Sequence, residues 1–357
     1  MEADINSRIA AGSLNNPVIY NRFANGVTVS QYIADFGRTH NLVQTSSLNA
    51  RAEQQNAAAK REDVLLQVDQ SFYLALRAQA ILRVAQETVN TRQVVVDQVT
   101  ALAQANLKSS LDVSFATVNL AQAKLLLVQA QNDVEGAFMY LSTALGSPGP
   151  QNFDLTEEPL PSSPPADLST LVADALRERP DLLARRLKEQ AAGKFATAER
   201  DLWFPTVSAL GSAGVIPFRQ EKITTLLSRY AAAGVNLNIP IFNGHLFSAR
   251  WAEAKLRAQV EEQNARDLQN RIGRDVRVAW WNANTAYQRL DLTAQLLNQA
   301  TEALNLAQAR YNLGLSSIVE LSQAQLNKTE AEIQQASARY DYQSLLAVLN
   351  FQAGSLH

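Results

Sequence analysis

The sequence predicts a mainly α-helical protein made of very long helices, with a few β-strands. Three features predict this fold class: long stretches without glycine or proline, apolar side chains in helical ladders, and short segments in which apolar and polar residues alternate. The chain has 357 residues, a net charge of −2 and no cysteine. This charge gives no reason to expect a nucleic-acid partner. Without cysteine, neither a disulfide nor a thiolate metal site is possible.

Helix-breaking residues are absent over long distances. Neither glycine nor proline occurs from Arg38 to Glu135 or from Leu315 to Ala353, and Gly273 stands alone between His245 and Leu313. The residues in these stretches are mostly good helix formers. A helix from Arg38 to Asn106 would be roughly 100 Å long, at about 1.5 Å per residue. Such helices are too long to surround one compact core, so we expect them to pack side by side.

The last of these stretches carries two apolar ladders. The first follows alternating steps of three and four residues and comprises Leu321, Ala324, Ala331, Ala338, Tyr342, Leu345 and Leu349. The second repeats at every seventh residue and comprises Val319, Leu326, Ile333, Tyr340 and Ala347. Two ladders indicate two neighbouring helices, as in a closed ring of helices, whereas a two-stranded coiled coil needs one. An ordinary amphipathic bundle is the alternative.

The strand signals are few and occur in pairs. Apolar and polar residues alternate at Gly26–Ser30 and at Gly234–Ile239, as in strands of a sheet with one wet face. Thr206–Ile216 and Glu2–Ile9 are the expected partners, with loops at 10–22 and 217–229. Four strands cannot close a barrel alone, but strands from several subunits could do so.

The chain reads as two copies of one arrangement. Gly26 matches Gly234, and Phe72-Tyr73 matches Trp280-Trp281, at a constant offset; Asn106-Leu107 matches Asn312-Leu313 at a slightly shorter one. The predicted domains are a first repeat at 1–147, a proline-rich linker with a short equatorial helix at 148–178, and a second repeat at 179–357. Within the repeats we expect a strand pair at 1–37, a long helical hairpin at 38–146, a helix at 180–203, a strand pair at 205–243 and a second hairpin at 245–352.

Three segments carry a resemblance to a known family: RPDLLARR at 179–186, DLWFPTVSALGSAG at 201–214 and NIPIFNG at 238–244. With the two-fold repeat, the chain resembles the TolC-type outer membrane efflux proteins. The resemblance implies a homotrimer whose strands form a twelve-stranded barrel in the outer membrane and whose helices form a periplasmic tunnel. It also implies a passive duct for small molecules or drugs, with a periplasmic adaptor, an inner-membrane pump and the lipid bilayer as partners.

The sequence departs from the family at its start. Family members usually carry a signal sequence and then a long first helix, but no signal peptide is visible here and the first strand is expected at once. The second repeat has this helix at 180–203, whereas the first repeat lacks it. We therefore expect that the chain is truncated or that its start is misassigned.

The two hairpin tips are candidates for a periplasmic gate. The resemblance implies that Tyr311 hydrogen-bonds to Asp112 and helps to hold the entrance shut, a bond that adaptor binding could break. Ser316 stands where the family can have an arginine, so this second link is expected to be weak. Alternatively, Tyr311 is an aromatic residue on a helix surface and Asp112 is an N-cap.

A ring of acidic residues is the candidate for ion selection. The resemblance places it at Glu320 and Gln323, just past the second tip. Three Glu320 carboxylates around one axis would attract cations, and the Gln323 ring would be uncharged. A solvated surface glutamate is the alternative.

The tips also offer a docking surface. Leu107, Lys108 and Ser109 at the first tip, with Gly314 and Leu315 at the second, would contact a helical hairpin of the adaptor that the resemblance implies. The alternative is turn chemistry, with glycine in left-handed geometry and serine as a cap.

No catalytic signature is present, so we expect neither an enzyme nor a cofactor or metal site. His40, His245 and His357 have no second ligand at helical spacing. No phosphate-binding loop, HExxH or GxSxG motif occurs. The remaining alternative to a duct is a coiled-coil scaffold or interaction protein that transports nothing.

Overall fold

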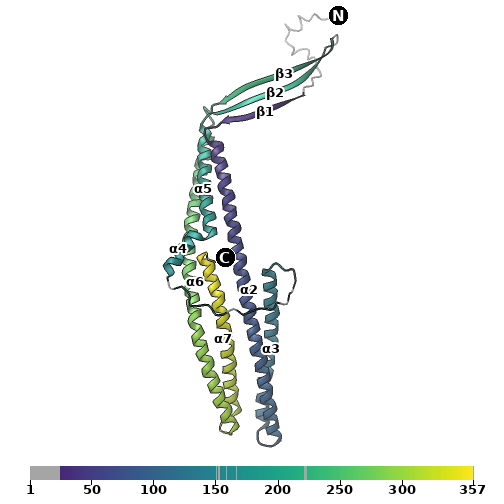
Figure 1. The fold of residues 1–357 in the computed structure, drawn as a ribbon, viewed down its shortest axis with the longest axis vertical. Helices are drawn as coiled ribbons and strands as arrows, with labels where there is room; N and C mark the ends of the chain where they lie inside the picture. The colour runs from purple at the N-terminus through teal and green to yellow at the C-terminus, as the bar shows by residue number, and fades with distance from the viewer. Residues whose placement is uncertain are drawn as a thin grey trace. The chain divides into compact units, whose positions relative to one another are not determined.

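The computed structural model describes residues 25–149, 151, 153–157, 159–165, 167–220 and 223–356, without the side chains of 216–220 and 223–228. The elements are, in order, β1 (Asn25–Ala34), α2 (Arg38–Gln104), α3 (Ser110–Ala144), α4 (Leu168–Glu178), α5 (Pro180–Arg200), η1 (Asp201–Trp203), β2 (Thr206–Gln220), β3 (Ile223–Asn238), α6 (Leu246–Asn312) and α7 (Ile318–Ala353). The predicted fold class, mainly α-helical with few strands, is confirmed (Figure 1).

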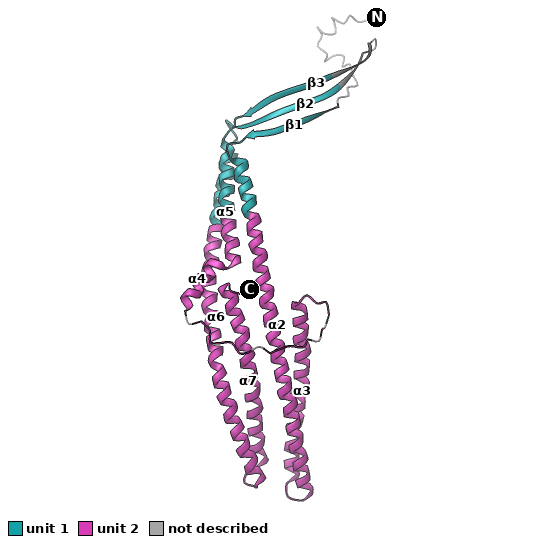
Figure 2. Cartoon of the chain, in the orientation of Figure 1, with its two compact units in different colours: residues 1–48, 190–260 teal, residues 49–189, 261–357 magenta. Residues whose placement is uncertain are grey.

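The long helices are continuous. α2 and α6 have 67 residues each, which corresponds to roughly 100 Å of helix. Gly273 lies inside α6 without ending it. The chain forms two compact units, one of residues 1–48 and 190–260 and the other of residues 49–189 and 261–357, and both α2 and α6 contribute to each (Figure 2).

The sheet in the first unit has three described strands in the order β1-β2-β3, with both pairs antiparallel. Gly26 on β1 lies opposite Gly214 on β2, which in turn lies opposite Tyr230 on β3. A Cβ atom at Gly214 would lie 2.6 Å from the Tyr230 ring, so the absence of a side chain makes room for the ring across the strands. All ten residues of β1 are exposed, so neither face of this strand is covered.

The predicted loop at 217–229 is wrong. β2 continues to Gln220, β3 begins at Ile223, and Pro217 pairs with Leu227 in the ladder. Proline favours a loop because it lacks an N–H donor, but in a strand it removes only one ladder hydrogen bond. The expected strand at Glu2–Ile9 and the loop at 10–22 lie outside the described residues.

Polar contacts fix the helices of the first unit. Asn41 donates to the buried Asp201 carboxylate at 2.8 Å. The buried Glu199 on α5 pairs with Arg250 on α6 at 2.7 Å. These contacts hold the start of α2, the end of α5 and the start of α6 together, next to the points where the strands begin and end.

In the second unit, α2 with α3 and α6 with α7 form two hairpins that lie side by side (Figure 1). α7 is central, because it packs against α3, α4, α2 and α6. The first ladder on α7 is buried throughout, apart from half-buried Leu345. The second ladder is buried at Tyr340 and Ala347, but Val319 and Leu326 near the tip are exposed. Two of the five residues of the second ladder are therefore left exposed by the described part of the chain.

α3 also keeps an apolar exposed face, which includes Phe115, Val118, Leu125 and Val128. Among the described helices it alone is long and apolar enough to cross a membrane. Its buried residues pack against α2, however, with Val134, Ala137 and Leu141 in one cluster with residues of α2. α3 is therefore a helix of the bundle whose other apolar face the described part of the chain leaves exposed.

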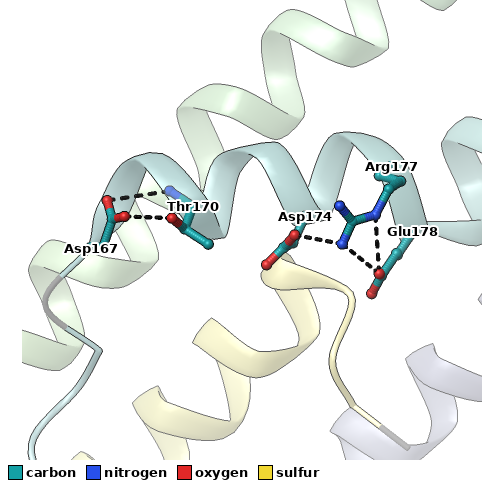
Figure 3. A network of polar contacts seen from close by, with 5 residues as sticks. All are labelled: Asp167, Thr170, Asp174, Arg177 and Glu178. Atoms are coloured by element: carbon teal, nitrogen blue, oxygen red, sulfur yellow. Dashed lines mark hydrogen bonds and ion pairs between the residues drawn. The ribbon is translucent and has the colours of Figure 1, made fainter.

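The linker and α4 wrap around the hairpins. Asp167 caps α4 by accepting hydrogen bonds from the backbone of Ser169 and Thr170. Figure 3 shows its bonds with Thr170, together with the pairs of Arg177 with Asp174 and Glu178 toward the other end of the helix. The hydroxyl and backbone donors around the Asp167 carboxyl lower its pKa to about 2. The apolar face of α4 packs on α5 and α6, through Ala175, Leu182, Ile272 and Val276.

Arg179 joins the start of α5 to the end of α7. Its guanidinium pairs with Asp181 at 2.7 Å and donates to the Gln352 side chain at 2.7 Å. Gly354 ends α7 in left-handed geometry (φ 75°), and a Cβ there would lie 3.1 Å from Arg179. Because only 11 % of the Arg179 side chain is exposed, these bonds form largely away from water.

We expect Arg179→Ala to destabilise the protein by about 2 kcal/mol, because it removes charge-assisted hydrogen bonds from a mostly buried site. Urea unfolding followed by circular dichroism measures the change. Arg61→Ala, which removes an exposed arginine of α2, is the control and should leave the midpoint unchanged. Equal midpoints for the two variants would contradict the role of Arg179 as a joint.

Candidate functional site

The first hairpin tip connects α2 to α3 through Ala105–Ser109. Asn106 adopts left-handed geometry (φ 62°), and the Leu107 N–H bonds back to Leu102 O at 2.9 Å, which satisfies the end of α2. Ser109 is the N-cap of α3 and forms a capping box with Asp112. Asp112 is therefore the third helical residue rather than the N-cap, which corrects the alternative reading of this position.

The second tip repeats this geometry. Gly314 is left-handed (φ 72°), the Leu315 N–H bonds to Arg310 O at 2.8 Å, and Ser317 caps α7. The left-handed residue, the cap and the third helical residue are thus Gly314, Ser317 and Glu320. They correspond to Asn106, Ser109 and Asp112. The tips consequently align at the same offset as the rest of the repeat, which corrects the sequence match of Asn106 with Asn312.

A hydrophobic cluster closes the space between the two hairpins directly above the tips. It contains buried side chains from all four helices: Val95, Val99, Ala116, Tyr311, Ile318 and Leu321. The Tyr311 residue is only 2 % exposed, so it is not the surface aromatic of the alternative reading. The sequence singled out Tyr311 alone. The other members are ordinary apolar ladder residues, and nothing in their spacing marks them as part of a gate.

A cation lies on the face of Tyr311. The Nζ atom of Lys108, at the first tip, is 4.0 Å from the centre of the Tyr311 ring, which belongs to the second hairpin. This cation–π contact links the two hairpins directly. The sequence placed Lys108 only in the docking surface, because pairing of the tips cannot be read from linear spacing.

The predicted bond between Tyr311 and Asp112 is not formed in this structure. One Asp112 oxygen accepts from the Ser109 backbone N–H at 3.1 Å, and the buried Tyr311 hydroxyl has no hydrogen-bond partner among the described residues. Burial raises the pKa of Tyr311, and the nearby negative charge of Asp112 raises it further. The two groups are thus neighbours within one cluster. The hydroxyl of Ser316 is likewise buried and unpaired.

Glu320 and Gln323 are both exposed on α7. Glu320 pairs with Arg310, on the other arm of the same hairpin, at 3.1 Å. Gln323 donates to Asn327 at 2.9 Å. Arg310 was not among the predicted site residues, although a basic residue in the last turn before the tip and an acidic residue in the first turn after it are a recognisable pair. The field of any Glu320 ring is therefore reduced by a local positive charge.

The docking residues divide into two groups. Leu107 and Leu315 are 69 % and 67 % exposed, so each tip presents a bare leucine. Ser109 and Gly314 serve the turns themselves, as the N-cap and the left-handed residue. Among the described residues no group of three possible metal ligands occurs. His40 lies 2.7 Å from the side chain of Gln44.

Long helical hairpins, a partly uncovered sheet and paired tips define the class of a channel protein built from α-helices and β-strands. The profile of the family described as "Outer membrane efflux protein" matches residues 4–147 and 171–355, and the chain belongs to this family. The chain accordingly has the function of an outer-membrane efflux channel, and the family is one of channels rather than enzymes.

Individual relatives agree with this assignment. The chain is 23 % identical over 345 residues to "Outer membrane protein TolC" of Escherichia coli (strain K12), covering 90 % of this chain and 69 % of the relative. It is 24 % identical to "Outer membrane protein OprJ" of Pseudomonas aeruginosa, covering 89 % and 67 %. Among solved structures, the outer-membrane channel OprN superposes with a TM-score of 0.80 at 19 % identity, covering 94 % of this chain and 81 % of that one. The Campylobacter jejuni CmeC channel gives 0.78 at 18 %, covering 94 % and 71 %.

We expect Lys108→Gln to raise the open probability of the channel about two- to fivefold, because it removes the cation–π contact between the hairpins. Single-channel recording in planar bilayers measures this. Lys60→Gln, at an exposed position of α2, is the control and should have no effect.

Tyr311→Leu should open the channel as well, and the double variant with Lys108→Gln should add little to it, since both changes remove the same contact. Fully additive effects would show that Lys108 and Tyr311 act separately.

Proposed function

We propose that three copies of this chain form one continuous duct, which passes small molecules or drugs from a periplasmic adaptor and an inner-membrane pump to the exterior. The observation that carries the proposal is the apolar surface that one chain leaves uncovered. β1 is exposed on both faces, and Val319 and Leu326 on α7 are 53 % and 42 % exposed. Neighbouring copies and lipid would cover these surfaces.

The sheet is the membrane part of this proposal. Its exposed apolar residues include Val27, Val29, Tyr32, Val235 and Leu237. The three valines and Leu237 lie on one face of the sheet and would be stable in lipid, whereas Tyr32 lies on the opposite face. The outer edges of β1 and β3 carry no partner strand among the described residues. A barrel closed by several chains removes such edges, and four strands from each of three chains would give twelve.

The helices are the periplasmic part. The two repeats at 1–147 and 179–357, joined by the linker at 148–178, would each contribute one hairpin to the tunnel wall. The second ladder of α7 supports a ring, because a helix of a neighbouring copy would cover its two exposed residues, Val319 and Leu326. A scaffold that transports nothing would leave the uncovered sheet without a role.

The tips are the proposed entrance. Tyr311, Asp112 and Ser316 would form a gate in the closed state, held by the buried cluster and by the Lys108 contact. In this gate the unpaired Tyr311 hydroxyl would donate to Asp112, and this bond would satisfy a buried donor. The leucines at positions 107 and 315 would dock against a helical hairpin of the adaptor, with an inner-membrane pump beyond it.

We expect the combined substitution Leu107→Asp and Leu315→Asp to abolish crosslinking of the channel to its adaptor, because each change places a carboxylate in an apolar contact. The control carries Leu107→Met and Leu315→Met, which keep the surface apolar. Crosslinking in membranes and electrophoresis of unheated samples give the readouts. The aspartate variant should still run as a trimer that heat dissociates.

Two outcomes would contradict separate parts of the proposal, namely the docking surface at the tips and the duct itself. Undiminished crosslinking of the aspartate variant would remove the tips as docking surface. A protein that fractionates as a water-soluble species without heat-sensitive trimers would favour the scaffold and reject the duct.

We expect Glu320→Gln to weaken the cation preference of the channel, because three carboxylates would leave the entrance ring. Arg310→Gln should strengthen it, since each Glu320 would lose its local positive partner. Reversal potentials in asymmetric KCl measure both effects. Gln323→Glu is the third variant and should also strengthen the preference by adding a second ring. If all three variants have the reversal potential of the unsubstituted channel, Glu320 and Gln323 do not form a selectivity ring.

A further inference from the structure

Arg92 is a buried cation that the proposed gate does not yet explain. It lies in the last third of α2, toward the first tip, and is 4 % exposed. No hydrogen bond or ion pair to it occurs in the described part of the chain, and its Nη1 atom is completely enclosed without a partner. Loss of hydration lowers the pKa of Arg92 to about 10, so the group still carries its charge at neutral pH.

The surroundings of Arg92 do not compensate for this charge. The guanidinium lines a cavity of about 30 Å³, together with Leu304 of α6 and with Gln325, Lys328 and Glu332 of α7. Glu332 is already paired with Lys328 at 2.6 Å. The other acidic residue of the lining, Glu87, is exposed on α2. A cavity of this size has room for about one water molecule, which cannot replace the hydration shell of a guanidinium.

The position of Arg92 connects it to the gate. The buried residues of this part of α2 are Thr88, Arg92, Val95 and Val99, in steps of four, three and four. They form one seam, and Val95 and Val99 belong to the cluster with Tyr311. Arg92 therefore occupies a core position directly next to the contact that would hold the two hairpins together at their tips.

We propose that Arg92 biases the tips toward opening, because its charge is desolvated while α6 and α7 lie against α2 and becomes hydrated when they separate. An unpaired buried charge destabilises the packed arrangement. The apolar cluster and the Lys108 contact favour the packed arrangement. The closed tip is then a balance between these effects, and an adaptor needs to supply only part of the free energy of opening. The inference rests on the proposed gate.

A purely structural role would predict the opposite behaviour. A polar residue in a helical seam can fix the register of its neighbours, and its loss then loosens the packing. Under the present proposal, an apolar residue of similar length makes the packing tighter. Arg92→Met distinguishes the two, because methionine fills the same space without a charge.

The experiment measures the trimeric channel, extracted from outer membranes, in two ways. Arg92→Met should raise the Tm by about 2–4 °C or more. It should also lower the open probability in planar bilayers about fivefold or more. Arg61→Met, at an exposed site of the same helix, is the matched control and should change neither.

A second variant supplies a counter-charge instead of removing the charge. Gln325 is 4 % exposed and lines the same cavity, so Gln325→Glu places a carboxylate beside Arg92. Alone, it should also raise the Tm and lower the open probability. When Gln325→Glu is combined with Arg92→Met, the Tm should fall below that of Arg92→Met alone. The new carboxylate is then buried without the Arg92 charge beside it.

The outcomes separate this inference from the proposed gate. A lower Tm for Arg92→Met overturns it in favour of a register role. A higher Tm with an unchanged open probability also overturns it, even if Lys108→Gln and Tyr311→Leu still open the channel and so sustain the gate. If those two variants have no effect either, the gate at the tips fails as well.

Discussion

Close approach of α7 to its neighbours is the constraint on which the second unit depends. Small residues, among them Ala331, Ala338 and Ala347, are buried along this helix. They allow one helix to lie against α2, α3 and α6 over many turns. Each contact is narrow, so stability comes from length rather than from a central core. Helices that pack in this way leave apolar side chains exposed on their other faces, among them Val319 on α7 and Phe115 on α3.

Helix length and the positions of two strands were accessible from the sequence because they depend on local rules. The glycine-free and proline-free stretches predicted the bounds of α6 and α7 to within three residues, and period-two alternation located β1 and the end of β3. The fourth expected strand, at Glu2–Ile9, lies outside the described residues. Pro217 misled, since a single missing donor does not end a strand whose other backbone groups remain paired. Propensity reports what a residue prefers, but the register of neighbouring strands decides where pairing stops.

The site at the tips could be predicted only in part, because its contacts join residues that are far apart in the sequence. Tyr311 could be named from the resemblance, but its contacts with Lys108 and with Val99 join positions about two hundred residues apart. Arg92 gave no signal at all. An arginine between Thr91 and Gln93 reads as part of a solvated face, and only the arrival of Leu304 and Gln325 from other helices buries it. Whether a charged side chain is buried in a helical bundle depends on how the helices pack, and the local sequence does not show it.

The linker at 148–178 connects helices of both hairpins through polar contacts. Glu157 receives Arg83 from α2 and Arg339 from α7, Tyr342 donates to Ser162 O, and Trp280 of α6 donates to Pro165 O. The linker therefore fastens α2, from the first hairpin, to α6 and α7, from the second. Helices held together at this point can separate only beyond it. The segment of helix between the linker and Tyr311 would be the lever arm of the proposed gate.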